Sequence, residues 1–404
     1  MKLACIFGSW SLSLRGSLDF ESIWEDPRGL TGSELAVVRV SSELAKLGHE
    51  VHLFTVSSDA VWEGVNIHSI DDLALVDRSF DAAVSFNEPD LLRMVTPRLR
   101  VCQQLLNDFG YCHKGFDDFV DLFVSPSEAH RARSLTDPSC RVVERAPTGF
   151  LGSYTPDPSR WVVIPLGCDP ERYQGVEKVR GRVVYCSSPD RGLHWLLHAW
   201  PLIKLQVPEA NLRIFYRIQP WIESCRALPF SPTNDKLKAR ALFIEACIPR
   251  LSKLDVEVCG SVSRRTIETE LAQAQVLAYP CDPVSWTEGF SCAVLEGCAA
   301  AACPVISSVD ALGAIYGSVL PMVPRGDWDQ WKSLVVYALQ DQDFCHSVNV
   351  RAAEFARART WNKHAEQLAA AIRTRLAPER DIHFRRDAEP EGRAVPRTAV
   401  EVGV

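Results

Sequence analysis

Short apolar runs alternate with longer amphipathic stretches over most of the chain, and this alternation restricts the fold more than any other feature of the sequence. Buried parallel strands read as short continuous apolar runs, and the helices that connect them carry one apolar face. In the first part of the chain, runs of this kind occupy residues 2–7, 51–56, 82–86, 100–106 and 122–125. The pattern predicts an α/β fold built on a parallel sheet.

The same alternation begins again in the second part of the chain, with strand-like runs at residues 182–186, 212–216, 256–259, 276–279 and 304–306. Residues 146–160, between the two series, are rich in Pro, Gly and Ser, and the apolar residues 161–165 follow them. We therefore expect two doubly wound domains, one over residues 1–155 and one over residues 156–360. Parallel sheets bind ligands at the carboxyl ends of their strands, so two facing sheets would create an interdomain cleft.

The C-terminal part of the chain divides into two segments. Residues 361–376 have the pattern of a helix, which we expect to cross back to the N-terminal domain. Residues 377–404 are charged, contain proline and have no apolar period. We expect this tail to be disordered.

The composition limits the classes of partner and the location. The chain has 404 residues, of which 47% are apolar, and its 44 basic and 51 acidic side chains give a formal net charge of −7. This charge disfavours nonspecific binding to nucleic acid or to an anionic membrane surface. The 14 cysteines form no C-x-x-C pair, and no transmembrane or signal-peptide pattern occurs. Both features favour a reduced, cytoplasmic protein, for which peripheral contact with a membrane stays open.

The segment 286–306, WTEGFSCAVLEGCAAAACPVI, carries the most specific chemistry in the chain. Gly289 allows backbone amides to approach a ligand closely, and a helix that begins near Ser291 directs its free N–H groups at an anion. Glu288 lies just before this helix and Glu296 lies inside it, so the two carboxylates could bind hydroxyl groups on either side of a diphosphate. A nucleotide sugar has this shape.

The two carboxylates have a simpler explanation. Glu288 could be an ordinary acidic residue at a helix N-terminus, and Glu296 could be a solvated helix residue. The helix, however, is almost entirely apolar and small and leads into the strand-like residues 304–306, which indicates that it is buried. A buried Glu296 would need a partner, so we favour a functional interpretation.

Two further turns could hold phosphate. Residues 29–33, Gly-Leu-Thr-Gly-Ser, open a helix, and residues 187–192, Ser-Ser-Pro-Asp-Arg-Gly, connect a strand to a helix with Arg191 in the turn. Backbone N–H groups at Gly32 and the guanidinium of Arg191 could both bind phosphate oxygens. The alternatives are a plain strand-to-helix connection and an exposed arginine in a loop.

Segment 286–306 resembles the E-x7-E donor signature of the retaining glycosyltransferases of family four, which have the GT-B fold of two facing Rossmann-like domains. The glycine turn at 29–33, the sequence V-I-P-L-G-C-D-P at 163–170, the Arg191 turn and the loop at 260–263 occur in the family's order. The resemblance implies an enzyme that transfers a sugar from a nucleotide diphosphate sugar, UDP- or GDP-linked, with retention of configuration. No other cofactor is implied.

The resemblance also implies roles for individual residues. Glu288 and the amides that follow it would hold the sugar, Glu296 would bind the ribose, and Arg191 with Gly32 would stabilise the departing diphosphate. The loop at 260–263 would lie against the nucleobase, although a plain turn explains it nearly as well. The implied donor-binding residues are Thr31, Gly32, Arg191, Ser261, Val262, Glu288, Gly289, Phe290, Ser291 and Glu296.

The chain departs from the family pattern at two places. Many relatives carry a histidine after the strand that corresponds to residues 101–106, but Asn107 stands there, and His113 follows six residues later. Either residue could take the place of the histidine, and we include Asn107 with Glu288 and Arg191 among the candidate catalytic residues. The family's first cation after the strand 182–186 is also missing.

No metal site is expected. Asp327-Trp-Asp329 and Asp341-Gln-Asp343 have the D-x-D pattern that holds a metal ion in other glycosyltransferase architectures. Both lie late in the chain in polar segments, so we interpret them as solvated acidic surface. Arg191 and the two helix N-termini already provide positive charge for a diphosphate.

The acceptor is not identified by the sequence. The N-terminal loops carry candidate acceptor-side residues, namely Trp10, Arg15, Asn107 and His113. A glycan, a lipid-linked precursor, a small molecule, a protein and a modified nucleic-acid base all stay open. The alternative functions are a nucleotide-sugar-binding protein that has lost turnover and, ranked lower, a sugar phosphorylase or epimerase on the same fold.

Overall fold

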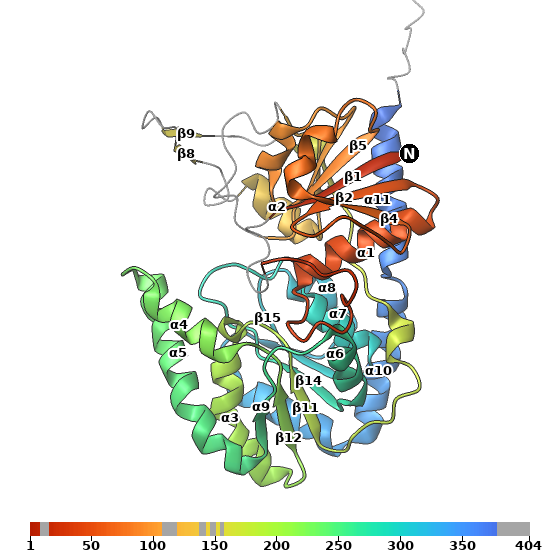
Figure 1. The fold of residues 1–404 in the computed structure, drawn as a ribbon. Coiled ribbons are helices and arrows are strands. Elements are labelled where there is room, and N and C mark those ends of the chain that lie inside the picture. The colour runs from red at the N-terminus through yellow and green to blue at the C-terminus, as the bar shows by residue number, and fades with distance from the viewer. Residues whose placement is uncertain (9–15, 107–118, 137–142, 146–150, 154–156, 378–404) are drawn as a thin grey trace, which may run out of the picture.

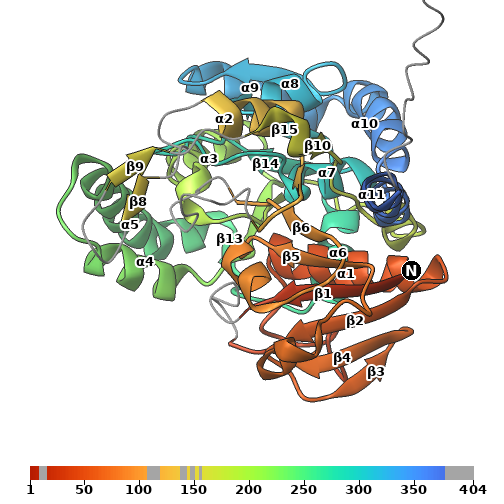
Figure 2. The same ribbon diagram turned by 90° about the horizontal axis from the view of Figure 1, so that it is seen from above.

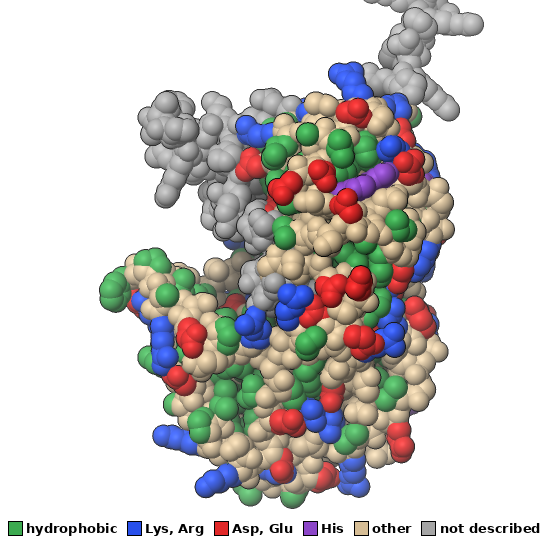
Figure 3. Space-filling model, in the orientation of Figure 1, with side chains coloured by type: hydrophobic (Ala, Val, Ile, Leu, Met, Phe, Trp, Pro, Cys, Tyr) green, Lys and Arg blue, Asp and Glu red, His purple; other side chains and the backbone are tan. Residues whose placement is uncertain are grey.

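The structure is a computed structural model that describes residues 1–8, 16–106, 119–136, 143–145, 151–153 and 157–377. The candidate residues Trp10, Arg15, Asn107 and His113 and the tail from residue 378 lie outside these ranges. The described residues form two α/β domains, one above the other in Figure 1 and in the space-filling view of the same orientation (Figure 3). The predicted α/β class with two doubly wound parallel sheets is confirmed.

The N-terminal domain contains an eight-stranded sheet in which neighbouring strands are parallel, except for the antiparallel edge pair β3 and β4. In sheet order its strands are β10 (Trp161–Val163), β7 (Leu122–Ser125), β6 (Arg100–Gln103), β5 (Ala82–Phe86), β1 (Lys2–Phe7), β2 (Glu50–Thr55), β4 (Val65–Ser69) and β3 (Ala60–Trp62). The central strands β1 and β5 are almost completely buried, as continuous apolar strands covered on both faces must be.

The C-terminal domain contains a six-stranded sheet in which every neighbouring pair is parallel. In sheet order its strands are β13 (Val256–Val258), β12 (Asn211–Ile214), β11 (Arg182–Tyr185), β14 (Val276–Tyr279), β15 (Pro304–Ser308) and β16 (Met322–Pro324). A separate antiparallel hairpin pairs β8 (Val143–Arg145) with β9 (Leu151–Ser153).

Helices cover both faces of each sheet. In the C-terminal domain α3 and α9 pack on one face and α6 and α7 on the other, while α10 packs against α7. The helices are α1 (Gly32–Lys46), α2 (Glu128–Thr136), α3 (Leu193–Gln206), α4 (Ile218–Ala227), α5 (Pro232–Leu251), α6 (Arg264–Gln273), α7 (Cys292–Ala299), α8 (Leu312–Tyr316), α9 (Trp328–Gln340), α10 (Gln342–Arg357) and α11 (Trp361–Leu376).

The last helix, α11, packs along α1 of the N-terminal domain, and both views show the two helices side by side (Figures 1 and 2). The chain therefore passes between the domains twice. The two passages touch, because the Cys168 amide donates to the Arg359 carbonyl at 3.0 Å. At Gly167 a Cβ atom would overlap the backbone of Thr360 and Trp361, so only glycine fits where the passages cross.

The boundary between the domains differs from the one expected at residue 155. Strand β10 (Trp161–Val163) pairs with β7 and completes the N-terminal sheet, so the chain leaves this domain only after Val163. The Pro- and Gly-rich composition before residue 160 indicates a loop, but it does not reveal which sheet the next strand joins.

None of the helices in the described ranges is both long and apolar enough to cross a membrane. Every described cysteine is a free thiol, and most of them are buried.

Candidate functional site

The carboxyl ends of β11 and β14 bring together two residues that lie 97 positions apart in the sequence, Arg191 and Glu288. Arg191 Nη1 donates to Glu288 Oε1 at 2.7 Å, and the Tyr279 hydroxyl donates to the same carboxylate oxygen at 2.9 Å. Asp190 lies beside the guanidinium, with 3.1 Å between Oδ2 and Arg191 Nε. The result is a nearly buried ion pair at the edge of the sheet that faces the N-terminal domain.

The position of Arg191 depends on the turn that follows β11. The short 3-10 helix η7 (Pro189–Arg191) ends at Gly192, whose φ of 98° is left-handed. A Cβ atom at Gly192 would overlap the Pro280 carbonyl oxygen, which directly follows β14. Glycine is therefore required for the close approach of the two strand ends that brings Arg191 to Glu288.

Burial and charge act against each other in this ion pair. Burial raises the pKa of Glu288 above its ordinary value, although the charge of Arg191 and the hydrogen bond from Tyr279 lower it in part. Burial also opposes the charge of Arg191, but the carboxylates of Glu288 and Asp190 outweigh it and raise the arginine's pKa. Arg191 therefore keeps its positive charge at every relevant pH.

Asp310 shapes the loop that contains Glu288. Its Oδ2 accepts hydrogen bonds from the backbone N–H groups of Thr287 at 2.8 Å and of Glu288 at 3.0 Å. Asp310 itself is left-handed, with φ of 51°. Sequence reasoning missed this residue, because it lies 22 positions after Glu288 and belongs to no motif.

Glu296 forms a second, separate ion pair. Arg264, at the start of α6, donates to both oxygens of Glu296, with 3.2 Å between Nη1 and Oε2. The same guanidinium donates to Glu268 and to the Tyr173 hydroxyl, both at 2.9 Å. Glu296 therefore has the partner that its burial requires, and the interpretation as a solvated helix residue is wrong.

Arg264 was not singled out from the sequence. Burial alone would lower its pKa, but Glu296, Tyr173 and Glu268 raise it well above its ordinary value. Only one signal in the sequence could have indicated Arg264. It is a basic residue in the first turn of one helix, and a nearby helix carries a buried acid.

The glycine turn at 29–33 faces this region from the N-terminal domain. A Cβ atom at Gly32 would lie 3.9 Å from Cys292 Sγ, so the N-termini of α1 and α7 approach each other across the domains. At Gly29 a Cβ atom would lie 2.7 Å from the Val262 carbonyl oxygen, which places the loop after β13 against the same turn. The structure thus brings Gly32 together with α7, and Gly29 together with Val262.

The other candidate donor-binding residues lie nearby and differ in exposure and in their contacts. Thr31 caps α1 in a capping box with Glu34, and Ser261 is half-buried beside Val262. Phe290 is buried, and its ring packs against Tyr316 with 6.2 Å between centroids, so its side chain belongs to the core. Only its backbone could contact a ligand.

The start of α7 leaves its amides available to an anion. Gly289 and Ser291 precede the helix, and Ser291 has the left-handed φ of 73° and makes no side-chain cap bond to α7. The first N–H groups of a helix need an external acceptor. An anion between α7 and α1 would supply it.

A direct hydrogen bond joins the domains at this loop. The Ser127 hydroxyl, at the start of α2, donates to the Gly289 carbonyl at 2.7 Å. His130, in the first turn of α2, also lies near this loop, with 5.9 Å between the centroids of its ring and the Trp286 ring. Arg133 lies over the Trp286 ring at 4.8 Å. The sequence reasoning did not name Ser127, His130 or Arg133.

His130 is held by the N-terminal domain. Its ring nitrogens lie 3.0 Å from the Leu106 carbonyl oxygen and 3.1 Å from Ser125 Oγ. Burial lowers its pKa to about 4, so the ring is neutral at pH 7. This buried histidine lies at the carboxyl ends of β6 and β7. In the sequence, the segment that contains Asn107 and His113 lies between these two strands.

Asn87 orders the carboxyl ends of the N-terminal strands. It follows β5 with φ of 65°, and its Oδ1 accepts from the amides of Leu105 at 2.7 Å and Leu106 at 3.1 Å. Its Nδ2 donates to Ser33 Oγ in the first turn of α1 at 3.2 Å. An asparagine directly after a predicted strand is a sequence signal for such a turn.

The D-x-D segments take part in local structure. Asp327 and Asp341 cap α9 and α10 through their side chains, and Asp329 pairs with Lys332 at 2.8 Å. Within the described ranges, no group of three or more histidine, cysteine or acidic side chains is arranged to hold a metal ion.

Comparisons with known proteins agree with this architecture. Residues 180–341 match the family model described as "Glycosyl transferases group 1", which covers the Arg191 turn and the segment with Glu288 and Glu296. No curated protein matches the chain in sequence. The matched region is the greater part of the C-terminal domain.

Solved structures resemble the whole described fold. Sucrose-phosphate synthase from Thermosynechococcus elongatus has a TM-score of 0.61 at 13% identity, over 93% of this chain and 99% of that one. The trehalose-6-phosphate synthase OtsA has 0.62 at 11% identity, over 92% and 99%. Anabaena Alr3699/HepE, solved in complex with UDP and glucose, has 0.59 at 12% identity, over 93% and 100%. The chain has the GT-B fold, and the family match supports the GT-B glycosyltransferase superfamily.

Proposed function

We propose that the protein is a retaining glycosyltransferase that takes a sugar from a nucleotide diphosphate sugar bound between its two domains. The observation that carries this proposal is the buried Arg191–Glu288 pair at the carboxyl ends of β11 and β14, just before α7, whose N-terminus approaches that of α1. A cation, a carboxylate and two helix N-termini within one interdomain region match a ligand with a diphosphate flanked by hydroxylated rings. The group 1 family match supports the same donor class.

Each group has a task in this proposal. Arg191 and the amides at the starts of α1 and α7 bind the diphosphate, and Glu288 accepts hydrogen bonds from sugar hydroxyls. Glu296, whose carboxylate Arg264 holds in place, accepts from the ribose. A carboxylate has about four acceptor positions, so its contacts with arginine leave room for hydroxyl donors.

The chemistry follows from the charge that develops on the leaving group. The bond between the anomeric carbon and the β-phosphate oxygen breaks, and the acceptor oxygen forms its bond to that carbon on the same face. The acceptor proton passes to the departing phosphate oxygen, which Arg191 and the helix N-termini stabilise. This route needs no metal ion and no separate protein base, and we propose both absences as part of the function.

The fold and the family match leave the sugar, the nucleotide and the acceptor open. UDP- and GDP-linked donors are the first to test, and a cytoplasmic location is proposed from the reduced cysteines. A ligand that binds only the folded protein raises its melting temperature, so a thermal-shift screen of nucleotide sugars identifies the donor.

The Glu288→Gln variant tests the role of the site. It keeps the size of the side chain but removes the charge, and we expect transfer or donor hydrolysis to fall at least about 100-fold, with the fold preserved. The matched control is Glu366→Gln on the exposed side of α11. Wild-type turnover in the Glu288 variant would contradict the assignment, and saturable donor binding without any nucleotide release in the wild type would favour a binding protein.

A further inference from the structure

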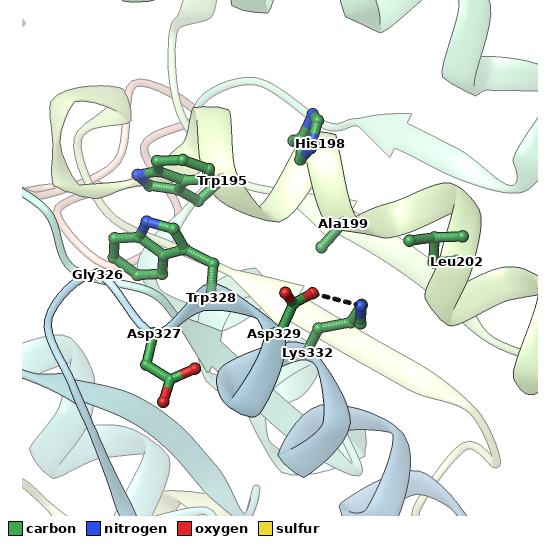
Figure 4. A pocket seen from close by; sticks show the side chains of 9 residues that line it. All are labelled: Trp195, His198, Ala199, Leu202, Gly326, Asp327, Trp328, Asp329 and Lys332. Carbon is green, nitrogen blue, oxygen red and sulfur yellow. Dashed lines mark hydrogen bonds and ion pairs between the residues drawn. The ribbon is translucent and has the colours of Figure 1, made fainter.

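A cavity of about 250 Å³ lies on the outer side of the C-terminal domain, between α3 and the start of α9 (Figure 4). It is lined by side chains of helices that pack on the face of the sheet away from α6 and α7. The residues of the interdomain site are absent from its lining. This cavity is therefore a different site from the one proposed to bind the donor.

Two tryptophans form one wall of the cavity. Trp195 of α3 and Trp328 of α9 stack with 4.7 Å between ring centroids and 24° between ring planes, and both are half-buried. Figure 4 shows the two indoles lying parallel at one end of the cavity. Indoles usually pack in the core, so an aromatic pair left partly open beside a cavity is a surface prepared for a flat apolar group.

This wall is rigid. The Trp195 indole N–H donates to Asp282 Oδ2 at 3.0 Å, and the Asp282 carboxylate also accepts from Arg240 and Arg325, both at 2.7 Å. Asp282 is itself buried. A ligand that stacks on a ring already fixed in this way loses little affinity to ordering the protein.

Beside the apolar Ala199 and Leu202 and the backbone of Gly326, the rest of the cavity is lined by four polar side chains. Asp329 and Lys332 come from α9, Asp327 is the N-cap residue of this helix, and His198 comes from α3. Asp329 and Lys332 pair at 2.8 Å and so present a donor and an acceptor together (Figure 4). The aromatic wall and this polar rim are complementary to a sugar ring, which has an apolar C–H face and hydroxyl groups around its edge.

The charges and geometry exclude other ligands of similar size. Two carboxylates against one lysine disfavour phosphates, nucleotides and other anions. A quaternary ammonium needs aromatic faces around it, whereas Trp195 and Trp328 stack on each other and leave a single platform. An apolar peptide side chain would make no hydrogen bonds with the polar groups of the rim.

We propose that this cavity is a second carbohydrate site that binds a neutral sugar ring of an oligosaccharide, separate from the transfer site. If the proposed function is correct, its natural occupant is a ring of the acceptor or product. Trp328, between the two aspartates of the D-x-D segment at 327–329, then supplies part of the sugar platform. Arg240 connects the cavity to the Arg191 turn. It donates to the Asp190 carbonyl at 3.4 Å and to Asp282, which also accepts from Trp195, so one hydrogen-bonded cluster lies between the two sites.

Isothermal titration calorimetry with neutral hexasaccharides of different linkage tests the proposal. Maltohexaose, cellohexaose, mannohexaose and xylohexaose are titrated into the full-length protein without any nucleotide. We expect at least one to bind, and we expect Trp328→Ala to weaken that binding by at least about tenfold. Because the measurement needs no donor and no turnover, its outcome is independent of the proposed transferase activity.

Further variants test whether a loss of binding reflects misfolding and whether the saccharide binds in this cavity. Ala199→Leu adds bulk to the cavity wall without removing the tryptophan pair, and it should weaken binding equally. Phe230→Ala, a 92% exposed aromatic outside the cavity, and Glu288→Gln should both bind like the wild type. Absence of binding to all four saccharides, or binding that survives both cavity variants, would overturn the proposal.

Discussion

Arg191 and Glu288 show how one buried charge depends on another. Each is almost enclosed, and the direct contact of 2.7 Å is what makes the burial of the carboxylate tolerable. Removing one partner of such a pair leaves an uncompensated charge, which costs more than the intact pair contributes. The site is therefore a place where function and stability share the same residues.

Arg191→Met tests this dependence. We expect the free energy of unfolding at pH 8 to fall by about 3–5 kcal/mol, because Glu288 then remains buried without its cation. Burial already raises the pKa of Glu288, and loss of Arg191 raises it further. A carboxyl group with a folded pKa above its unfolded value loses stability as the pH rises through the folded pKa, so the loss should be smaller at pH 5.

Chemical denaturation at the two pH values measures this effect. The double variant Arg191→Met with Glu288→Gln removes both charges, and it should recover much of the stability and lose the added pH dependence. An equal loss for Arg191→Met at pH 5 and pH 8 would show that the charge of Glu288 is not responsible.

At the scale of elements, helix α1 begins where the two domains face each other. Thr31 accepts from the Glu34 amide at 3.4 Å, and Glu34 accepts from the Thr31 amide at 2.7 Å, so the capping box holds the first turn of the helix. The box satisfies some of the N-terminal amides and leaves others free for a ligand. The same turn thus stabilises the helix and points its dipole at the interdomain region.

Thr31→Ala should lower the free energy of unfolding by about 1 kcal/mol, because the helix loses its N-cap acceptor. Thr31→Ser keeps the hydroxyl and should unfold like the wild type in the same denaturation experiment. If the alanine and serine variants unfold alike, the capping box has no measurable role in stability.

At the scale of the whole molecule, α11 ties the end of the C-terminal domain to the N-terminal sheet. His364 of this helix is buried, with Nδ1 lying 2.8 Å from the Pro165 carbonyl oxygen and Nε2 lying 2.9 Å from Gln103 Nε2. Because a carbonyl only accepts, Nδ1 carries the proton and Nε2 accepts from the glutamine. One neutral imidazole therefore connects β6, the passage between the domains and the last helix.

This imidazole predicts acid sensitivity. Burial lowers the pKa of His364 from its ordinary value of 6.5 to about 4. Below pH 6.5 the unfolded chain takes up a proton that the folded protein does not, so the stability from this residue is lost as the pH falls toward 4. The loss attributable to His364 is on the order of 3 kcal/mol.

His364→Asn isolates this contribution, since its amide can still donate to the Pro165 carbonyl. The difference in unfolding free energy between wild type and variant should shrink between pH 7 and pH 4. Other histidines whose pKa burial lowers, such as His130 and the half-buried His194, titrate in both proteins and cancel in the comparison. A constant difference would contradict the assignment of the acid sensitivity to His364.

Much of the architecture was predictable because it is recorded in local pattern. The runs expected as strands at 82–86, 122–125 and 276–279 coincide with β5, β7 and β14, since a strand buried on both faces is apolar over nearly all of its length. The short strands β3, β4 and β16 were missed because they lie toward sheet edges, where fewer residues are buried and the apolar pattern is weak.

The chemistry of the site was predictable only in part. Periodicity and the glycine turns indicated the strand ends, and the apolar helix indicated that Glu296 is buried. Which residues compensate the charges depended on the tertiary structure alone, because Arg264 lies 32 positions from Glu296 and Arg191 lies 97 from Glu288. Local sequence controls the type of each element through backbone and burial preferences, whereas pairing across such distances arises only when the elements pack.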